Sequence, residues 1–331
     1  MMRVFALCLA LLPCAALAQL PVVQQVVDRH ILPGFQTLAQ RTEALKAASG
    51  EGCTGLETPY HDAFDAWIGV SHLRFGPTEA QDRAFAMAFW PDAKGFTPKS
   101  LSALIEDQDP AVNNPVDFAE VSVAARGLFA LEYLLYDAQF STAGEDGYRC
   151  DLIRAIAQDM DRIAVDILSD WTPHYAALLT APGPDSRYRS DEEAAQELFK
   201  ALSTGLQFTS DTRLGRPMGT FDKPRPKRAE ARRSERSLRN VILSLAALRD
   251  LAALLSEGHP GTAAELDAAF DRSIALAERL EDPDFASVST PQGRFRVEAL
   301  KNSIDEIRAI TATQLGPQLG VAAGFNSLDG D

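Results

Sequence analysis

The stretch ARGLFALEYLLYD, residues 125–137, places a single glutamate inside a run of apolar side chains. Around it, apolar positions at helical spacing form a continuous stripe, and Glu132 adjoins that stripe. The stripe consists of Phe118, Val121, Ala125, Leu128, Leu131 and Leu135. Burying an ionised carboxylate costs several kcal/mol unless it is paired or bound to a metal. We therefore expect a core helix here, with a partner for Glu132 such as Arg126, Arg74 or an arginine of the basic segment at residues 213–239.

Helical spacing of apolar residues extends over nearly the whole chain. We expect helices at residues 22–48, 60–75, 79–90, 98–106, 117–136, 148–180, 191–210, 229–257, 262–280 and 291–313. Pro33 and Gly34 favour a kink in the first of these, and Pro173 favours an interruption of the 148–180 helix. No window alternates with period two, so the pattern predicts an all-α fold.

A proline- and glycine-rich segment, PGPDS at residues 182–186, is the strongest linker pattern in the chain. It separates two stretches of similar size and helix content. We therefore predict two helical bundles, residues 19–181 and 187–331, packed against one another.

The N-terminal sequence MMRVFALCLALLPCAALAQ has the features of a secretory signal peptide: an early Arg3, an apolar segment and a small-residue cleavage site. We expect residues 1–18 to be removed and the mature protein to be periplasmic. No later segment is apolar over about 18–20 residues, so no membrane span is expected after cleavage. Cys53 and Cys150 remain and predict a disulfide in an oxidising compartment, with two free thiols as the alternative.

The net charge of −14 argues against nucleic acid as a partner. Residues 213–239 break this acidic pattern, with ten Lys or Arg against three acids. Proline and glycine interrupt the first part of this segment, which predicts a loop there and a helix only from residue 229. The cluster is either a solvated face, a site where guanidinium groups grip a carboxylate or phosphate, or a source of partners for Glu132 and other acids.

Residues 60–77, YHDAFDAWIGVSHLRFGP, carry polar side chains at helical spacing. One helix face would hold His61, Asp65, Ile68 and His72. This spacing suits a metal pair or an imidazole oriented by an aspartate, and it equally suits a solvated stripe opposite an apolar face. His72, beside Arg74 near the helix end, is the candidate for a crevice between helices.

The sequence contains no HExxH, GxSxG, Walker loop or CxxCH motif. Neither Cys53 nor Cys150 has a nearby residue at the sequence spacing expected for a catalytic nucleophile and its base. A function must therefore rest on side chains that distant parts of the chain bring together.

Several segments together resemble the imelysin family of exported, all-helical bacterial proteins, also classified as peptidase family M75. They run over nearly all of the mature chain, from the Trp67 helix through FWP and GLFALEYLLY to SERSLRN. The family hallmark is G-x-H-x-x-E. Gly127 and Glu132 match it, and Phe129 replaces the histidine. Phenylalanine cannot ligate a metal, so the replacement removes the best argument for a metallopeptidase at this position.

The resemblance implies a duplicated helix-bundle fold with the motif near the contact between the halves, a cell-envelope location and, for several relatives, a link to iron-regulated uptake. We predict a non-enzymatic protein whose cleft between the bundles binds a metal, a metal chelate or an anionic group. The candidate ligand-binding residues are Glu132, His72, Arg74, Arg232, Arg233 and Glu235. Glu132 and His72 are the candidate metal ligands, for iron or zinc. The alternatives are a metal-dependent peptidase with a rearranged ligand set, and a structural module that contacts envelope proteins.

Overall fold

The computed structural model describes residues 21–321, and every regular element within them is helical. One isolated β-bridge, between Thr220 and Lys223, is the only strand-like pairing in this part of the chain. The all-α prediction is therefore confirmed. The predicted leader, residues 1–18, lies outside the described residues. No helix of residues 21–321 combines the length and apolar character needed to cross a bilayer.

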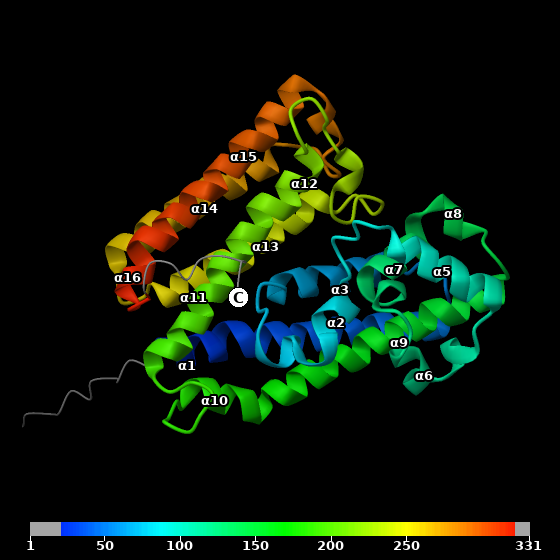
Figure 1. Ribbon diagram of the computed structural model, residues 1–331, viewed down its shortest axis with the longest axis horizontal. Coiled ribbons are helices and arrows are strands. Elements are labelled where there is room, and N and C mark those ends of the chain that lie inside the picture. The colour runs from blue at the N-terminus through cyan, green and yellow to red at the C-terminus, as the bar shows by residue number, and fades with distance from the viewer. Residues whose placement is uncertain (1–20, 322–331) are drawn as a thin grey trace, which may run out of the picture.

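The first half of the molecule is built around three long helices (Figure 1). Its helices are α1 Val22–Val26, α2 Leu32–Glu51, α3 Glu57–Val70, α4 Arg83–Met87, α5 Phe96–Asp107, α6 Pro115–Ala119, α7 Gly127–Tyr136, α8 Ala138–Ser141, α9 Asp146–Asp170 and α10 Ala176–Thr180. Helix α2 packs against both α3 and α9, and α7 packs against α9. Just beyond α9, the wholly buried Trp171 stacks on Phe35 of α2, with 6.0 Å between ring centroids.

The second half is a bundle in which α14 lies beside both α13 and α15 (Figure 1). Its helices are α11 Asp191–Gln207, α12 Gly215–Met218, α13 Ser237–Leu255, α14 Pro260–Glu278, α15 Pro291–Ile310 and α16 Gly316–Gln318. Helix α11 packs against α13 and α15 and so completes the bundle. Each long helix buries an apolar stripe against its neighbours, as its spacing predicts.

The two halves share an extensive contact. Helix α13 packs against α3, and α1 packs against α11 and α13. The buried apolar side chains of both halves form one continuous cluster. Residues 182–186 connect α10 to α11 without helical structure. The division into bundles 19–181 and 187–331 stays a prediction, since packing across the linker is as continuous as packing within each half.

Cys53, which follows α2, and Cys150, on α9, form the predicted disulfide. Their Cα atoms lie 5.4 Å apart, and 97 positions separate them in the sequence. Closing a loop of about 100 residues stabilises a fold by roughly 4–5 kcal/mol in the chain-entropy description.

The sequence predicts irregularities in the helices at Pro33 and Pro173. The interruption near Pro173 is confirmed, because α9 ends at Asp170 and α10 begins at Ala176. The kink predicted at Pro33 stays a prediction, since α2 begins one residue before this proline, at Leu32. A π-helical turn at Val27–Ile31 lies directly before α2 and is the irregular part of this helical segment.

Several predicted helices are shorter in the structure: the 60–75 helix ends at Val70, and the 79–90 helix is reduced to α4. Two more lie beside Glu132. The 117–136 helix is broken, and its second part, α7, begins at Gly127. The helix predicted from residue 229 begins at Ser237, because Ala231 and Glu235 adopt left-handed backbone conformations with φ of +46° and +54°. Both irregularities adjoin Glu132 and shape its surroundings.

Candidate functional site

Helix α7 begins at Gly127, whose φ of +70° lies in the left-handed region. A Cβ atom here would lie 2.3 Å from the carbonyl oxygens of Ala86 and Met87. Glycine alone permits both this conformation and this approach. The first residue of the Gly127–Glu132 motif therefore fixes where α7 starts against the end of α4.

Glu132, on α7, is 1% exposed. Its Oε1 accepts hydrogen bonds from the Ser234 backbone N–H at 3.0 Å and from the Ser234 hydroxyl at 2.8 Å. Burial raises the pKa of Glu132, while these two bonds and the more distant Arg233 and Arg232 oppose the rise. The arginine partner expected from the sequence is thus replaced by two neutral donors from the second half of the chain.

Ser234 reaches Glu132 from the loop of residues 229–236. The left-handed Ala231 and Glu235 keep this loop out of α13. Within it, the Arg236 N–H donates to the Ala231 carbonyl at 3.0 Å, which closes the turn around Ser234. The N–H of Ser234 therefore has no helical acceptor and donates to the carboxylate instead.

Arg236, 1% exposed, fastens this loop to α3. Its guanidinium donates to Nδ1 of His61 at 2.7 Å and forms an ion pair with Asp65. Arg239 of α13 donates to the same carboxylate, with Nε 2.9 Å from Oδ1. The His61 Nε2 is hydrogen-bonded to the Tyr136 hydroxyl at 3.0 Å. The polar face predicted on α3 is therefore occupied by arginines of the second half.

A cavity of about 120 Å³ lies between α7, residues 89–97 from the end of α4 to the start of α5, Arg216 of α12 and residues 227–233. Its aromatic walls are Phe89, Trp90, Phe129 and Tyr133. Phe129 packs edge-on against Phe64 at 5.4 Å and nearly parallel to Trp90 at 6.3 Å between ring centroids. Glu132 lines the same cavity. The residue that replaces the motif histidine is therefore part of an aromatic wall beside Glu132.

Four cationic side chains also line this cavity: Arg216, Lys227, Arg228 and Arg233. Arg233 is compensated, because it forms an ion pair with Asp137 and its guanidinium lies 3.6 Å from the Tyr133 ring centroid. Within residues 21–321, the other three cations have no carboxylate within the 4.0 Å of an ion pair. The cavity thus contains positive charge that the protein itself leaves unpaired.

Among these cations without a carboxylate partner, Arg216 is the clearest case. Burial, and then the charge of Arg228, lower the pKa of Arg216. Its Nε–H is buried and has no acceptor in the described part of the chain. Its guanidinium also lies over the Trp90 ring, 5.8 Å from the centroid. An anion placed between the two guanidinium groups would relieve their repulsion and supply the missing acceptor.

Asp92, the other acid in the cavity wall, is already satisfied. It accepts hydrogen bonds from the backbone N–H groups of Phe96 at 2.9 Å and Thr97 at 2.8 Å, at the start of α5. Burial would raise the pKa of Asp92, but these hydrogen bonds lower it overall. Asp92 therefore stays ionised, but it forms no ion pair with the cavity's arginines in the described part of the chain.

The structure places His72 and Arg74 apart from this cavity. His72 is buried, and its Nε2 lies 2.8 Å from Nε2 of His30, so the two rings share one N–H···N hydrogen bond. Burial, then His30 and Arg213, hold the pKa of His72 well below its usual value. Arg74 pairs with Glu79 at the surface. Neither residue lines the cavity beside Glu132.

The remaining predicted residues lie in or beside the 229–236 loop. Arg233 lines the cavity, and Arg232, half-buried, lies close enough for its charge to lower the pKa of both Glu132 and Asp137. Glu235 is exposed, and no described cation forms an ion pair with it. The structure thus brings together Glu132, Arg232 and Arg233, and leaves Glu235 at the surface.

The predicted metal ligation by Glu132 and His72 stays a prediction. Their hydrogen-bond partners are different, Ser234 for Glu132 and His30 for His72. Within residues 21–321, no group of three or more His, Cys, Asp or Glu side chains is placed to hold a metal ion. These contacts favour the anionic alternative over a metal for the Glu132 cavity.

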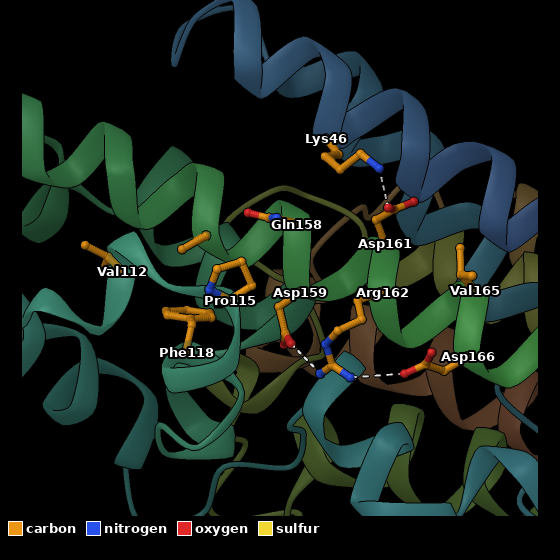
Figure 2. A pocket seen from close by; sticks show the side chains of 11 residues that line it. Lys46, Val112, Pro115, Phe118, Gln158, Asp159, Asp161, Arg162, Val165 and Asp166 are labelled. Carbon is orange, nitrogen blue, oxygen red and sulfur yellow. Dashed lines mark hydrogen bonds and ion pairs between the residues drawn. The ribbon is translucent and has the colours of Figure 1, made fainter.

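A larger cavity, of about 380 Å³, lies between α2, α6 and α9 (Figure 2). Figure 2 shows its charged side chains bound to one another: Lys46 to Asp161, and Arg162 to Asp159 and Asp166. Arg126 also donates two hydrogen bonds to the Asp159 carboxylate, of 2.8 and 3.0 Å. Each of these charged side chains thus has a partner of opposite charge, although Arg162 Nε and Asp161 Oδ1 are buried without a hydrogen bond in the described part of the chain.

Sequence reasoning missed Ser234, Arg216, Arg228 and Trp90 as site residues. Ser234 lies in SERSLRN and Trp90 in FWP, two of the segments that carry the family resemblance. Both arginines lie in the basic stretch, where ten cations share a similar local context. The resemblance therefore pointed to two of the four, and nothing local distinguished Arg216 and Arg228 from their neighbours.

A profile of the imelysin family matches residues 31–311. Iron-regulated protein A of Synechococcus elongatus is 24% identical over 321 residues, which covers 89% of this chain and 85% of that protein. The fold matches the crystal structure of an imelysin-like protein from Psychrobacter arcticum with a TM-score of 0.77 at 18% identity, over 91% of this chain and 95% of that one. A second crystal structure, from Parabacteroides distasonis, matches with a TM-score of 0.72 at 13% identity, over 88% and 93% of the two chains.

Proposed function

Since this chain belongs to the imelysin family, we propose that it is an exported binding protein that takes an anionic group into the Glu132 cavity. The proposed ligand presents a carboxylate or phosphate, either as a small anion or as the exposed end of an anionic iron chelate. A cavity of about 120 Å³ admits such a group but not a whole chelate, so the rest of a larger ligand would lie outside. The leader-like residues 1–18 support the periplasm as the location.

The observation that carries this proposal is the pair of uncompensated guanidinium groups. Arg216 and Arg228 line one small cavity, and the charge of one lowers the pKa of the other. Guanidinium forks bind carboxylates and phosphates through paired, charge-assisted hydrogen bonds. Lys227 adds a third cation without a carboxylate partner among the described residues. Trp90 and Phe129 supply apolar walls beside these cations.

Glu132 has a distinct role in this proposal. Its Oε1 accepts both Ser234 bonds, so protonation on Oε2 would turn the side chain into a neutral donor beside the cavity. Burial, which raises its pKa, favours that form. We therefore expect anion affinity to rise as Glu132 takes up a proton, because the proton removes a repulsive charge and adds an O–H donor.

The link to iron rests on the relatives. One curated relative is named iron-regulated protein A. Iron chelates that carry carboxylates are anionic, and their free carboxylates match the chemistry of the cavity. Free citrate and ferric citrate are therefore the appropriate probes, with phosphate as the small-anion comparison.

Calorimetric titration of these three anions into wild type, Arg216→Gln and Arg228→Gln tests the proposal. We expect each substitution to weaken binding at least about tenfold, because each removes a charge-assisted hydrogen bond. Without anion, Arg228→Gln should leave the melting temperature unchanged or raise it, since it relieves the repulsion of Arg216. Arg225→Gln is the matched control, because Arg225 belongs to the same basic stretch, is exposed and does not line the cavity. Equal affinity in all four proteins would contradict the proposal.

Measuring the metal content distinguishes the anion-binding proposal from metal ligation by Glu132. Iron and zinc per chain would be measured in wild type, Glu132→Ala and Phe129→His, purified without chelator. Near-stoichiometric metal that disappears in Glu132→Ala would favour a metal site centred on this carboxylate. Metal gained only in Phe129→His would show that the histidine supplies what this chain lacks. If neither metals nor anions change the melting temperature, the structural alternative gains support.

A further inference from the structure

The turn of residues 219–225, which follows α12, is held in place by hydrogen bonds. The Lys223 N–H donates to the Thr220 carbonyl at 3.1 Å, and the Arg225 N–H donates to the Pro217 carbonyl at 2.8 Å. Arg294, near the start of α15, donates to the Thr220 carbonyl at 3.1 Å. Every residue of the turn except Pro224 is exposed. The turn is therefore ordered and prominent at once.

Two phenylalanine side chains are presented at this end of the second half. Phe221, inside the turn, is 74% exposed, and Phe295, in the first part of α15, is 71% exposed. They share a neighbour, because Arg294 precedes Phe295 and its guanidinium lies 5.8 Å from the Phe221 ring centroid. Single exposed apolar residues are ordinary. Two highly exposed aromatic rings at the same end of the molecule indicate a contact surface.

The charge around these rings is opposite in sign to that of the whole protein. Lys223, Arg225 and Arg296 are exposed, and none forms an ion pair in the described part of the chain. Asp222 is the one acid inside the turn, and Glu298 is engaged by Arg294 at 2.7 Å. The net charge of the chain is −14, so this group of exposed cations beside two exposed rings differs in sign from the chain as a whole.

We propose that this end of the molecule, defined as Phe221, Lys223, Arg225, Phe295 and Arg296 and called the aromatic end, docks on the surface of an anionic phospholipid bilayer. The two rings enter the interfacial region, and the three cations contact lipid phosphates. The contact is peripheral and needs no membrane-spanning helix.

Charge and shape favour a bilayer over an acidic protein partner. Aromatic rings partition to the headgroup level, while lysine and arginine place their charge in the phosphate layer above their apolar stems. A prominent turn with its ring exposed inserts into a soft surface, whereas a protein partner would need a matching hollow. Anionic lipid also attracts exposed cations even on a protein whose net charge is negative.

The aromatic end is separate from the proposed anion site. None of its five residues lines the Glu132 cavity. Failure of vesicle binding would therefore leave the anion proposal intact, and loss of anion binding in Arg228→Gln would leave the aromatic end unchanged.

Co-sedimentation of the full exported chain with vesicles tests this inference. Wild type would be compared on phosphatidylglycerol and phosphatidylcholine vesicles, at low salt and at about 0.5 M salt, where exposed charges are screened. We expect binding to phosphatidylglycerol at low salt, and at least about tenfold weaker binding for Phe221→Ser/Phe295→Ser and for Lys223→Glu/Arg225→Glu. Val116→Ser is the matched control, because Val116 is also 74% exposed but lies on α6 in the other half.

Three results would overturn the inference. Wild type that stays in the supernatant with phosphatidylglycerol would exclude lipid docking, as would equal binding of the double phenylalanine variant. Equal binding to both lipids at both salt concentrations would remove the role of the cations. Circular dichroism of each variant establishes that any loss of binding occurs in folded protein. A wild-type dimer that dissociates in the phenylalanine variant, without vesicle binding, would assign the surface to a second copy of the chain instead.

Discussion

Glu132 and Asp159 are both buried carboxylates in the first half of the molecule, yet their surroundings differ. Asp159, 4% exposed, is gripped by Arg126 through two hydrogen bonds and also binds Arg162. Glu132, 1% exposed, accepts only the N–H and O–H of Ser234. The partner of Asp159 is cationic, and the donors to Glu132 are neutral.

The difference separates a structural ion pair from a site that can respond to its surroundings. The charges around Asp159 form a closed network in which each group has a partner (Figure 2). Around Glu132 the donors leave the negative charge without a direct cation, and burial raises its pKa. The cations nearby, Arg216 and Arg228, are likewise unpaired. A proton or an anion from outside can therefore change the Glu132 region, while the charges around Asp159 are already paired with one another.

The largest effect on the free energy of unfolding is expected when the Asp159 carboxylate is removed. Asp159→Ala leaves Arg126 buried without its partner, so we expect the free energy of unfolding to fall by about 3–5 kcal/mol. Urea denaturation followed by circular dichroism measures the loss. Arg126→Met/Asp159→Leu is the control, because replacing both charges by apolar groups should recover much of the stability. A loss below about 1 kcal/mol in Asp159→Ala would remove the contrast between the two carboxylates.

Gly127 joins the two regions, because it follows Arg126 and begins the helix that carries Glu132. Gly127→Ala places a Cβ atom against the carbonyls of Ala86 and Met87 at a φ of +70°. We expect a loss of about 2–3 kcal/mol in urea denaturation, from the left-handed conformation and the displaced backbone. Gly147→Ala, at a position in α9 where a Cβ meets nothing within 4 Å, should be neutral or stabilise the protein by up to about 1 kcal/mol. Equal effects at the two glycines would show that the approach of α7 to α4 is adaptable.

The smallest effect is expected at Glu132 itself, and it depends on pH. Glu132→Gln keeps an acceptor for Ser234, so the free energy of unfolding near neutral pH should change by no more than about 1 kcal/mol. In wild type the raised pKa means that the folded state keeps a proton to higher pH than the unfolded state. The stability from this group is therefore fully present below the unfolded pKa and is lost as pH rises through the folded pKa.

Urea denaturation over a pH series measures this difference between wild type and Glu132→Gln. Wild type should lose stability relative to the variant as pH rises above about 4.3, the usual pKa of a free glutamate. His30, whose pKa burial lowers to about 4, is present in both proteins and cancels in the difference. Parallel pH profiles would show that the Ser234 hydrogen bonds fully offset the burial of Glu132.

The sequence by itself determined the helical class of the fold and much of its layout. Apolar residues at helical spacing mark the faces of α9, α11, α13, α14 and α15, because each helix repeats the same burial every turn. The two cysteines predicted the disulfide, since the apolar leader indicated an oxidising compartment. The chain's own motif also located the site region, because a glutamate inside an apolar run needs compensation. These inferences depend on local patterns, which a sequence records directly.

Tertiary structure alone decided the partners. Ser234 lies 102 positions from Glu132, in a segment whose spacing predicts helix but whose backbone turns to bring an N–H to the carboxylate. In the basic stretch, Arg213 binds Glu230, Arg233 binds Asp137 and Arg236 binds Asp65. Arg216, Lys227 and Arg228, which line the Glu132 cavity, are among those that remain without such a carboxylate within residues 21–321. These cations share the same local context, and ion pairing depends on distance, so only the folded chain selects which of them are left for a ligand.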